Sequence, residues 1–363
     1  MTNNCANEID KPQKTQRLFY LDVLRVIACL CVIMVHASAG FVTKDFGSYN
    51  FWVGNVFDSL SRIGVPLFVM ISGSIFLDEN YNYTIKKLIN HIKKIVLFFV
   101  FWSLLYTAFF NILIPLIKHR NISAKTVIAG AVLGHYHLWF CFMIVGLYLI
   151  VPLLRLWVKK ENIEQVKYFI LLSFIFTMFL PSIIEYLSLI YPIFGGLNTI
   201  VNNVNIKYVG GFTVYFILGW FFNNIDIKHK KLIVVLGVCG LSISVVGTAF
   251  LSMMCNESHT AYGNLSVHVA LQAIMVYVMI KNKYEKISLQ DTRYERMIMF
   301  ISKNSLGVYA IHAAFVTCFN RVLVMLGVAN SIICIPMVFG MSFIISLFIS
   351  FVLGKIPVLK QFV

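Results

Sequence analysis

The chain has 363 residues, of which 59% are hydrophobic and only 12% charged, and its formal net charge is +15. Soluble globular domains contain about 25% charged residues, so this composition excludes a soluble fold and is typical of a multi-pass membrane protein. A basic balance also raises the question of nucleic-acid binding, but the cations do not form a stripe on one polar face. We therefore expect membrane lipids, and no nucleic acid, around this chain.

Apolar segments long enough to cross a membrane, at about 20 residues per span, recur along the chain. They predict an all-α, polytopic transmembrane bundle of about ten helices over residues 18–354, with a polar tail at 1–17 and a short tail at 355–363. The tail at 1–17 has no apolar signal-peptide core, so we expect the first span to be an uncleaved anchor. The expected spans, of which the sixth and eighth are short, are 18–39, 52–77, 95–117, 138–157, 168–190, 208–224, 232–254, 265–281, 305–327 and 332–354.

The basic residues predict the orientation of these spans. With the N-terminus in the cytoplasm, 22 of the 30 Lys and Arg residues fall in inner segments and 5 in outer loops. Cytoplasmic loops of membrane proteins are enriched in Lys and Arg. The sequence therefore predicts that both termini are cytoplasmic.

The first span carries three polar side chains that are costly in hydrocarbon, Asp22, Arg25 and His36. Asp22 and Arg25 are three residues apart, so they share a helix face and can pair. His36 follows Arg25 by eleven residues, just over three turns, which places it on the same face roughly 16 Å farther along. A structural ion pair and an interfacial histidine are alternative interpretations. Lipid would not tolerate this face, so we expect it to point into the bundle.

Five segments in order resemble the acyltransferase-3 family of bacterial membrane O-acyltransferases, in the subgroup related to enterobacterial-antigen O-acetyltransferases. The similarity spans most of the chain. It is carried by LDVLRVIACLCVIMVHA (21–37), GVPLFVMISGSIFL (64–77), KKLINHIKKIVLFFVFW (86–102), HLWFCFMIVGLYLIVPLLR (137–155) and NSLGVYAIH (304–312).

The resemblance implies an acyl-CoA-dependent O-acyltransferase in the inner (cytoplasmic) membrane. Its donor substrate would be acyl-CoA, most simply acetyl-CoA, and its acceptor a hydroxyl of a cell-surface or lipid-linked glycan, with no tightly bound cofactor. It implies catalytic roles for His36, Arg25 and Asp22, with His36 as general base or transient acyl carrier. The implied substrate-binding residues are Ser72, Lys87, Lys93, Lys94, His137, Trp139 and His312.

Several of these assignments have alternatives. Many family members have arginines where Lys87, Lys93 and Lys94 stand, and lysine binds phosphate as a point charge without a planar fork. Ser72 could contact substrate or a neighbouring helix, whereas Gly73 suits close helix packing. His135 and His137 lack a third ligand, so we expect no metal. A transporter or flippase for a lipid-linked sugar is the alternative function, because it too needs polar residues within the membrane.

A second intramembrane pair and the cysteines fit structural roles. Asp58 and Arg62 are four residues apart in the second expected span, so we predict an ion pair. The eight cysteines show no CxxC or zinc-type spacing, which favours small buried side chains.

Overall fold

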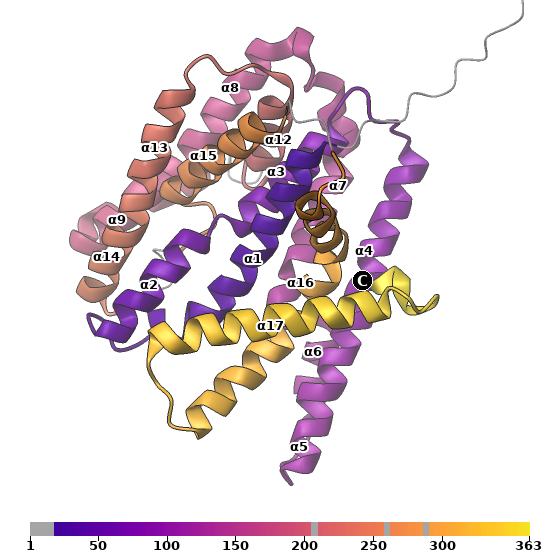
Figure 1. The fold of residues 1–363 in the computed structure, drawn as a ribbon. Helices are drawn as coiled ribbons and strands as arrows, with labels where there is room; N and C mark the ends of the chain where they lie inside the picture. Colours follow the sequence, from indigo (N-terminus) through magenta and orange to yellow (C-terminus); the bar gives the residue numbers. More distant parts are fainter. Residues whose placement is uncertain (1–17, 205–209, 258–261, 286–289) are drawn as a thin grey trace, which may run out of the picture.

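The computed structural model describes residues 18–204, 210–257, 262–285 and 290–363, and the predicted tail at 1–17 lies outside them. Helices and their connections make up all of this described part, without a strand, which confirms the all-α prediction (Figure 1). In chain order the helices are α1 (Phe19–Val42), α2 (Tyr49–Ser61), α3 (Gly64–Phe76), α4 (Ile85–Tyr106), η1 (Thr107–Leu113), α5 (Ile114–Ile117), α6 (Ala124–Leu133), η2 (Tyr136–Leu138), α7 (Trp139–Trp157), η3 (Lys160–Asn162), α8 (Ile163–Phe174), η4 (Ile175–Phe179), α9 (Leu180–Ile190), η5 (Pro192–Phe194), α10 (Gly195–Asn203), α12 (Thr213–Asn224), α13 (Lys230–Ser242), η6 (Ile243–Gly247), α14 (Thr248–Cys255), α15 (Val267–Tyr284), α16 (Arg293–Met325), α17 (Ser331–Leu353) and η7 (Leu359–Phe362).

Eight helices in the described residues are long and apolar enough to cross a membrane, so the protein is a multi-pass membrane protein. The predicted spans 208–224 and 265–281 correspond to α12 and α15, which are not among the eight. α12 has 12 residues, and most of them are buried inside the bundle. The total of about ten spans and the cytoplasmic side of both termini stay predictions.

Helix α1 lies in the middle of the bundle and contacts α2, α3, α15, α16 and α17 (Figure 1). A helix surrounded in this way buries its polar face among other helices, where partners satisfy it. The interior position expected for the polar face of α1 is therefore confirmed.

Helices α3 and α12 cross with their backbones in contact. A Cβ atom on Gly73 would lie 1.7 Å from the carbonyl oxygen of Phe216, and one on Gly219 would lie 1.9 Å from that of Met70. The Ser74 hydroxyl donates a hydrogen bond to the Gly219 carbonyl at 2.9 Å. Small residues permit such close crossings in membranes, so Gly73 is the packing glycine that the sequence predicts.

The predicted span 52–77 is divided into α2 and α3 at Arg62 and Ile63. Pro66 has no backbone N–H for the carbonyl four residues earlier, so the helix is interrupted there. The predicted pair forms at this break: Arg62 Nε and Nη2 lie 2.5 and 2.9 Å from the two carboxylate oxygens of buried Asp58. The arginine also lies over the ring of Tyr262.

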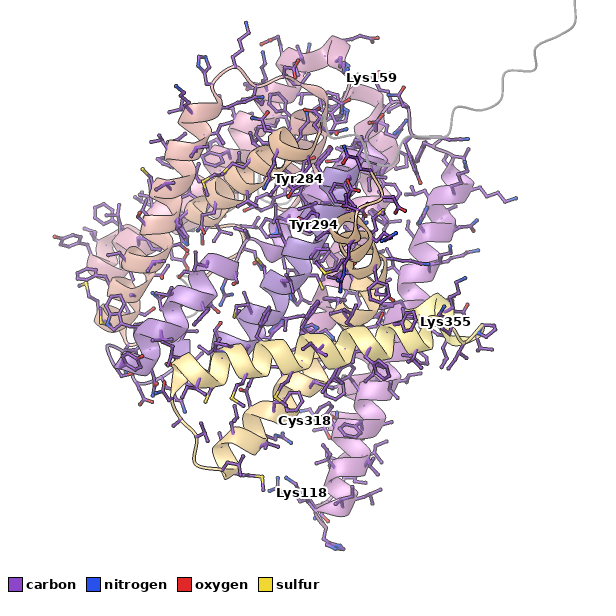
Figure 2. All side chains as sticks on the ribbon, in the orientation of Figure 1. Lys118, Lys159, Tyr284, Tyr294, Cys318 and Lys355 are labelled. Atoms are coloured by element: carbon purple, nitrogen blue, oxygen red, sulfur yellow. The ribbon has the colours of Figure 1, made fainter. Side chains whose placement is uncertain are left out.

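Helix α4 joins the basic segment 86–94 to the apolar segment that follows it. It begins after Thr84, whose side chain accepts a hydrogen bond from the backbone N–H of Lys87 at 3.2 Å. This cap fixes the start of the helix at Ile85 and places Lys86 and Lys87 in its first turn. Figure 2 shows Lys118, just after α5, and Lys159, just after α7, at opposite ends of the molecule.

Candidate active site

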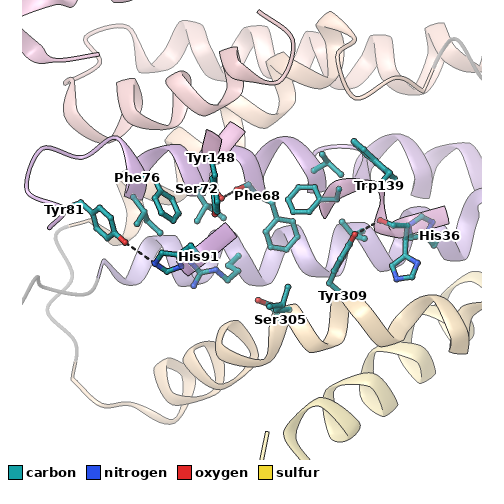
Figure 3. A pocket seen from close by; sticks show the side chains of 18 residues that line it. His36, Phe68, Ser72, Phe76, Tyr81, His91, Trp139, Tyr148, Ser305 and Tyr309 are labelled. Carbon is teal, nitrogen blue, oxygen red and sulfur yellow. Dashed lines mark hydrogen bonds between the residues drawn. The ribbon is translucent and has the colours of Figure 1, made fainter. Parts of the chain in front are cut away.

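One interior cavity of 370 Å³, called the main cavity below, runs along the polar face of α1. Arg25, Val32 and His36 all line it, which confirms that Arg25 and His36 share one face turned away from lipid. Figure 3 shows Tyr81 and His91 at one end of this cavity and His36 with Trp139 at the other. The cavity therefore covers the roughly 16 Å that eleven helical residues span.

Arg25 is held at the Tyr81 end by Asp22 and Ser302. The Ser302 hydroxyl donates to Asp22 Oδ1 at 2.6 Å and accepts from Arg25 Nη1 at 3.0 Å. Arg25 Nη1 also lies 3.3 Å from Asp22 Oδ1. Asp22 is 2% exposed, whereas the Arg25 side chain is 29% exposed toward the cavity. The carboxylate of the ion pair is thus buried and structural, whereas the guanidinium faces the cavity and can contact a ligand there.

Four histidines gather around the other end: His36, His135, His137 and His312, called the histidine cluster below. The rings of His36 and His312 stack at 5.3 Å with an interplanar angle of 29°, and His312 lies 5.4 Å from His137. His135 Nδ1 and His137 Nδ1 are 3.1 Å apart. These side chains come from α1, from the turn at η2 and from α16, so the cluster joins three segments far apart in the sequence.

Backbone carbonyls fix the protons of two of these imidazoles. His312 Nδ1 lies 2.7 Å from the Tyr309 carbonyl, so this nitrogen carries the proton and donates it. Its Nε2 is then a bare lone pair, and this buried atom has no hydrogen-bond partner in the described residues. His137 Nε2 lies 3.2 Å from the Ala310 carbonyl, which leaves its Nδ1 to accept from His135. The cluster therefore contains one buried imidazole nitrogen, His312 Nε2, that no hydrogen bond occupies in the described residues.

Ser72 and Ser74, which flank Gly73 on α3, point to different places. Ser72 lines the main cavity, where its hydroxyl donates to the Phe68 carbonyl at 3.0 Å. Ser74 is buried against α12 and contacts Tyr277 Oη at 2.6 Å. Ser72 therefore lies at the cavity wall, where it could contact substrate, and not in a contact between helices like that of Ser74.

The three lysines predicted to bind substrate separate. Lys94 lines a second cavity of 620 Å³, called the side chamber below, which shares Ser72, Tyr148 and five other wall residues with the main cavity. Lys87 donates to the Asn82 carbonyl at 3.1 Å and lines neither cavity. Lys93 is exposed and also lines neither cavity. Of the three lysines, only Lys94 therefore lines a chamber that borders the main cavity.

His137 and Trp139 are both at the His36 end. His137 is buried, and its carbonyl accepts a hydrogen bond from Tyr309 Oη at 2.5 Å. Trp139 is 39% exposed and lines the cavity. Within the described residues, no three His, Cys, Asp or Glu side chains are placed to hold one metal ion.

Residues 18–354 match a protein family described as an acyltransferase domain. The chain belongs to this acyltransferase family. No curated protein and no solved structure matches the chain. Membership in the family makes the protein a membrane acyltransferase and does not support the transporter alternative. The subgroup of enterobacterial-antigen O-acetyltransferases stays a prediction.

Sequence reasoning missed several side chains of this acyltransferase's site, including two on α16: Ser302, which holds Arg25, and Ser305, which lines the main cavity. With Tyr309 and His312 they follow each other at intervals of three, four and three residues, which is one helix face. This spacing was a usable signal. Tyr148 lies on α7 and Tyr81 in the loop after α3, and neither position has a local pattern that marks it.

Proposed function

We propose that this protein transfers an acyl group, most simply acetyl, from cytoplasmic acyl-CoA to a hydroxyl of a cell-surface or lipid-linked glycan, in the inner (cytoplasmic) membrane. The supporting observation is that Arg25 and His36, eleven residues apart on α1, line the same main cavity. A thin, elongated donor fits a passage of this form. Its arm passes Arg25 and brings the thioester to the histidine cluster.

Arg25 suits the donor arm because it is a fixed cation that remains partly exposed to the cavity. Its hydrogen bonds to Ser302 and Asp22 hold the guanidinium in place before the donor arrives. A guanidinium that is already oriented binds the polar groups of acyl-CoA more tightly, because little conformational freedom is then lost on binding. Asp22 acts through Arg25 and has a positioning role.

His36 carries the reaction. As general base it removes the proton of the acceptor hydroxyl while the oxygen attacks the thioester carbonyl carbon. The tetrahedral intermediate collapses with cleavage of the C–S bond, and the coenzyme A thiolate takes the proton from the imidazolium. As acyl carrier, His36 would instead attack the thioester itself and pass the acyl group to the hydroxyl in a second step. Incubation with radiolabelled acetyl-CoA without acceptor separates the routes, because only the second leaves label on the protein.

The acceptor is expected at the His36 end, where aromatic side chains are exposed. Trp139 and Tyr136 are 39% and 52% exposed, and the Tyr136 ring lies 5.0 Å from that of His36. Aromatic side chains offer an apolar face together with a polar edge, which suits the C–H face and hydroxyls of a sugar ring.

The test uses a strain that lacks this protein and expresses either wild type or a variant. Wild type restores an acetyl unit per repeat of the surface glycan by mass analysis, and His36→Ala does not. His229→Ala is the matched control, because this exposed histidine precedes α13 and lines neither cavity. An unchanged glycan mass in the deletion strain, or full acetylation by His36→Ala, would contradict the proposal.

A further inference from the structure

The side chamber has a wall that the proposed function does not use. Residues 354–363, called the C-terminal segment below, follow α17 and include η7. Pro357, Lys360, Gln361 and Val363 of this segment line the chamber, and none of them lines the main cavity. A cavity of 620 Å³ is large enough for a substantial part of a cofactor-sized ligand.

The C-terminal segment packs against α4 through a hydrogen bond and a stacked pair of rings. Trp102 Nε1 donates a hydrogen bond to the Phe362 carbonyl at 2.8 Å. The Phe362 ring stacks on Phe101 with a centroid distance of 4.3 Å and an interplanar angle of 8°. Gly307 on α16 leaves space for Val363, since a Cβ there would lie 3.0 Å from the Val363 Cβ. The segment therefore packs specifically against α4 and α16, and this packing fixes the position of Lys360 in the chamber wall.

Two cations from distant parts of the sequence face this chamber, Lys94 from α4 and Lys360 from the C-terminal segment. In the described residues, neither lies within ion-pair distance of a carboxylate. The lining of the chamber includes no Asp or Glu side chain, so these two like charges raise its positive potential and attract an anion. Ammonium groups bind phosphate through charge-assisted hydrogen bonds.

We propose that Lys94 and Lys360 bind a phosphate group of the acyl-CoA donor, which makes the C-terminal segment part of the donor site. The proposal rests on the proposed function. The phosphate lies in the side chamber, and the thin arm of the donor passes the shared wall at Ser72 and Tyr148 into the main cavity. Membrane lipid headgroups carry the same chemical group, so the experiment includes an arm for each source.

The experiment measures binding of acetyl-CoA and of acetyl-pantetheine, which lacks the nucleotide and its phosphates, to purified protein in nanodiscs of phosphatidylcholine. Lys360→Gln and Lys94→Gln each weaken acetyl-CoA binding by about tenfold, the effect of losing one charge-assisted hydrogen bond. Both leave acetyl-pantetheine binding unchanged, and Lys360→Arg retains most of the acetyl-CoA affinity. Lys355→Gln is the matched control, because Lys355 lies over the Phe351 ring and lines neither cavity.

A parallel arm measures the rise in melting temperature on adding phosphatidylglycerol. If Lys360→Gln reduces that rise and leaves acetyl-CoA affinity as in wild type, the lysines bind lipid headgroups and the proposal is overturned. Equal loss of acetyl-CoA and acetyl-pantetheine affinity also overturns it, because the effect is then not on a phosphate. Failure of wild type to bind acetyl-CoA is a separate result that removes the proposed function itself.

Discussion

Replacement of Ser302 by alanine tests whether Arg25 works because it is held in place. The Ser302 hydroxyl bridges the pair: it donates to Asp22 at 2.6 Å and accepts from Arg25 at 3.0 Å. Ser302→Ala removes both bonds, and the remaining Asp22–Arg25 contact is 3.3 Å long. Hydrogen bonds to charged groups contribute about 1.5–3 kcal/mol, so we expect a loss of that order, divided between folding stability and donor binding.

The division between stability and donor binding is the informative part. If Arg25 orients the donor, KM for acetyl-CoA increases by about tenfold, equivalent to about 1.4 kcal/mol. The kcat value changes little, because His36 lies three turns away and keeps its neighbours. The assay is acetyl transfer by purified protein over a range of acetyl-CoA concentrations, beside a thermal unfolding curve.

Ser342→Ala is the control for this prediction. Ser342 is equally buried, but its hydroxyl has no hydrogen-bond partner in the described residues, so its removal should change neither KM nor stability. A Ser302→Ala protein with a lowered melting temperature and an unchanged KM would refute the reasoning. The Asp22–Arg25–Ser302 contact would then only join α1 to α16.

Two further predictions concern packing and the histidine cluster. Gly73→Ala should abolish folded protein in detergent, because its Cβ would lie 1.7 Å from the Phe216 carbonyl, while Gly146→Ala, with open space around it, should fold as wild type. Monodisperse Gly73→Ala protein with wild-type stability would contradict the close α3–α12 crossing. His312→Ala should lower kcat by about 10- to 100-fold through misplacement of His36, with KM for acetyl-CoA unchanged, and His312→Phe should recover part of the loss by restoring a stacked ring. Equal kcat for the two variants would mean that stacking does not position His36.

Much of the site's geometry follows from the sequence where the periodicity of one helix decides it. The Asp22–Arg25 and Asp58–Arg62 pairs and the shared face of Arg25 and His36 depend only on helical spacing and on the cost of charge in lipid. These features were predictable because a single helix sets the distance between their members. The catalytic and binding roles of these residues stay predictions.

The remaining geometry depends on how different helices meet, which local sequence does not encode. Lys94 faces the side chamber and Lys93 does not, although both stand in the same basic segment. Tyr81 reaches the cavity from a loop, and the C-terminal segment closes the chamber through a contact with Trp102. No periodicity marks such contacts, because each is set by the packing of segments that are distant in the sequence.

The most direct test of the account is a sidedness assay in sealed inside-out membrane vesicles that carry native glycan acceptors in their lumen. Radiolabelled acetyl-CoA is added outside, where it meets the face that is cytoplasmic in the cell. A cavity that Arg25 and His36 line in common predicts label on the luminal glycan while coenzyme A stays outside, and no label with His36→Ala. Label that reaches the glycan only after the vesicles are broken would contradict transfer through the protein.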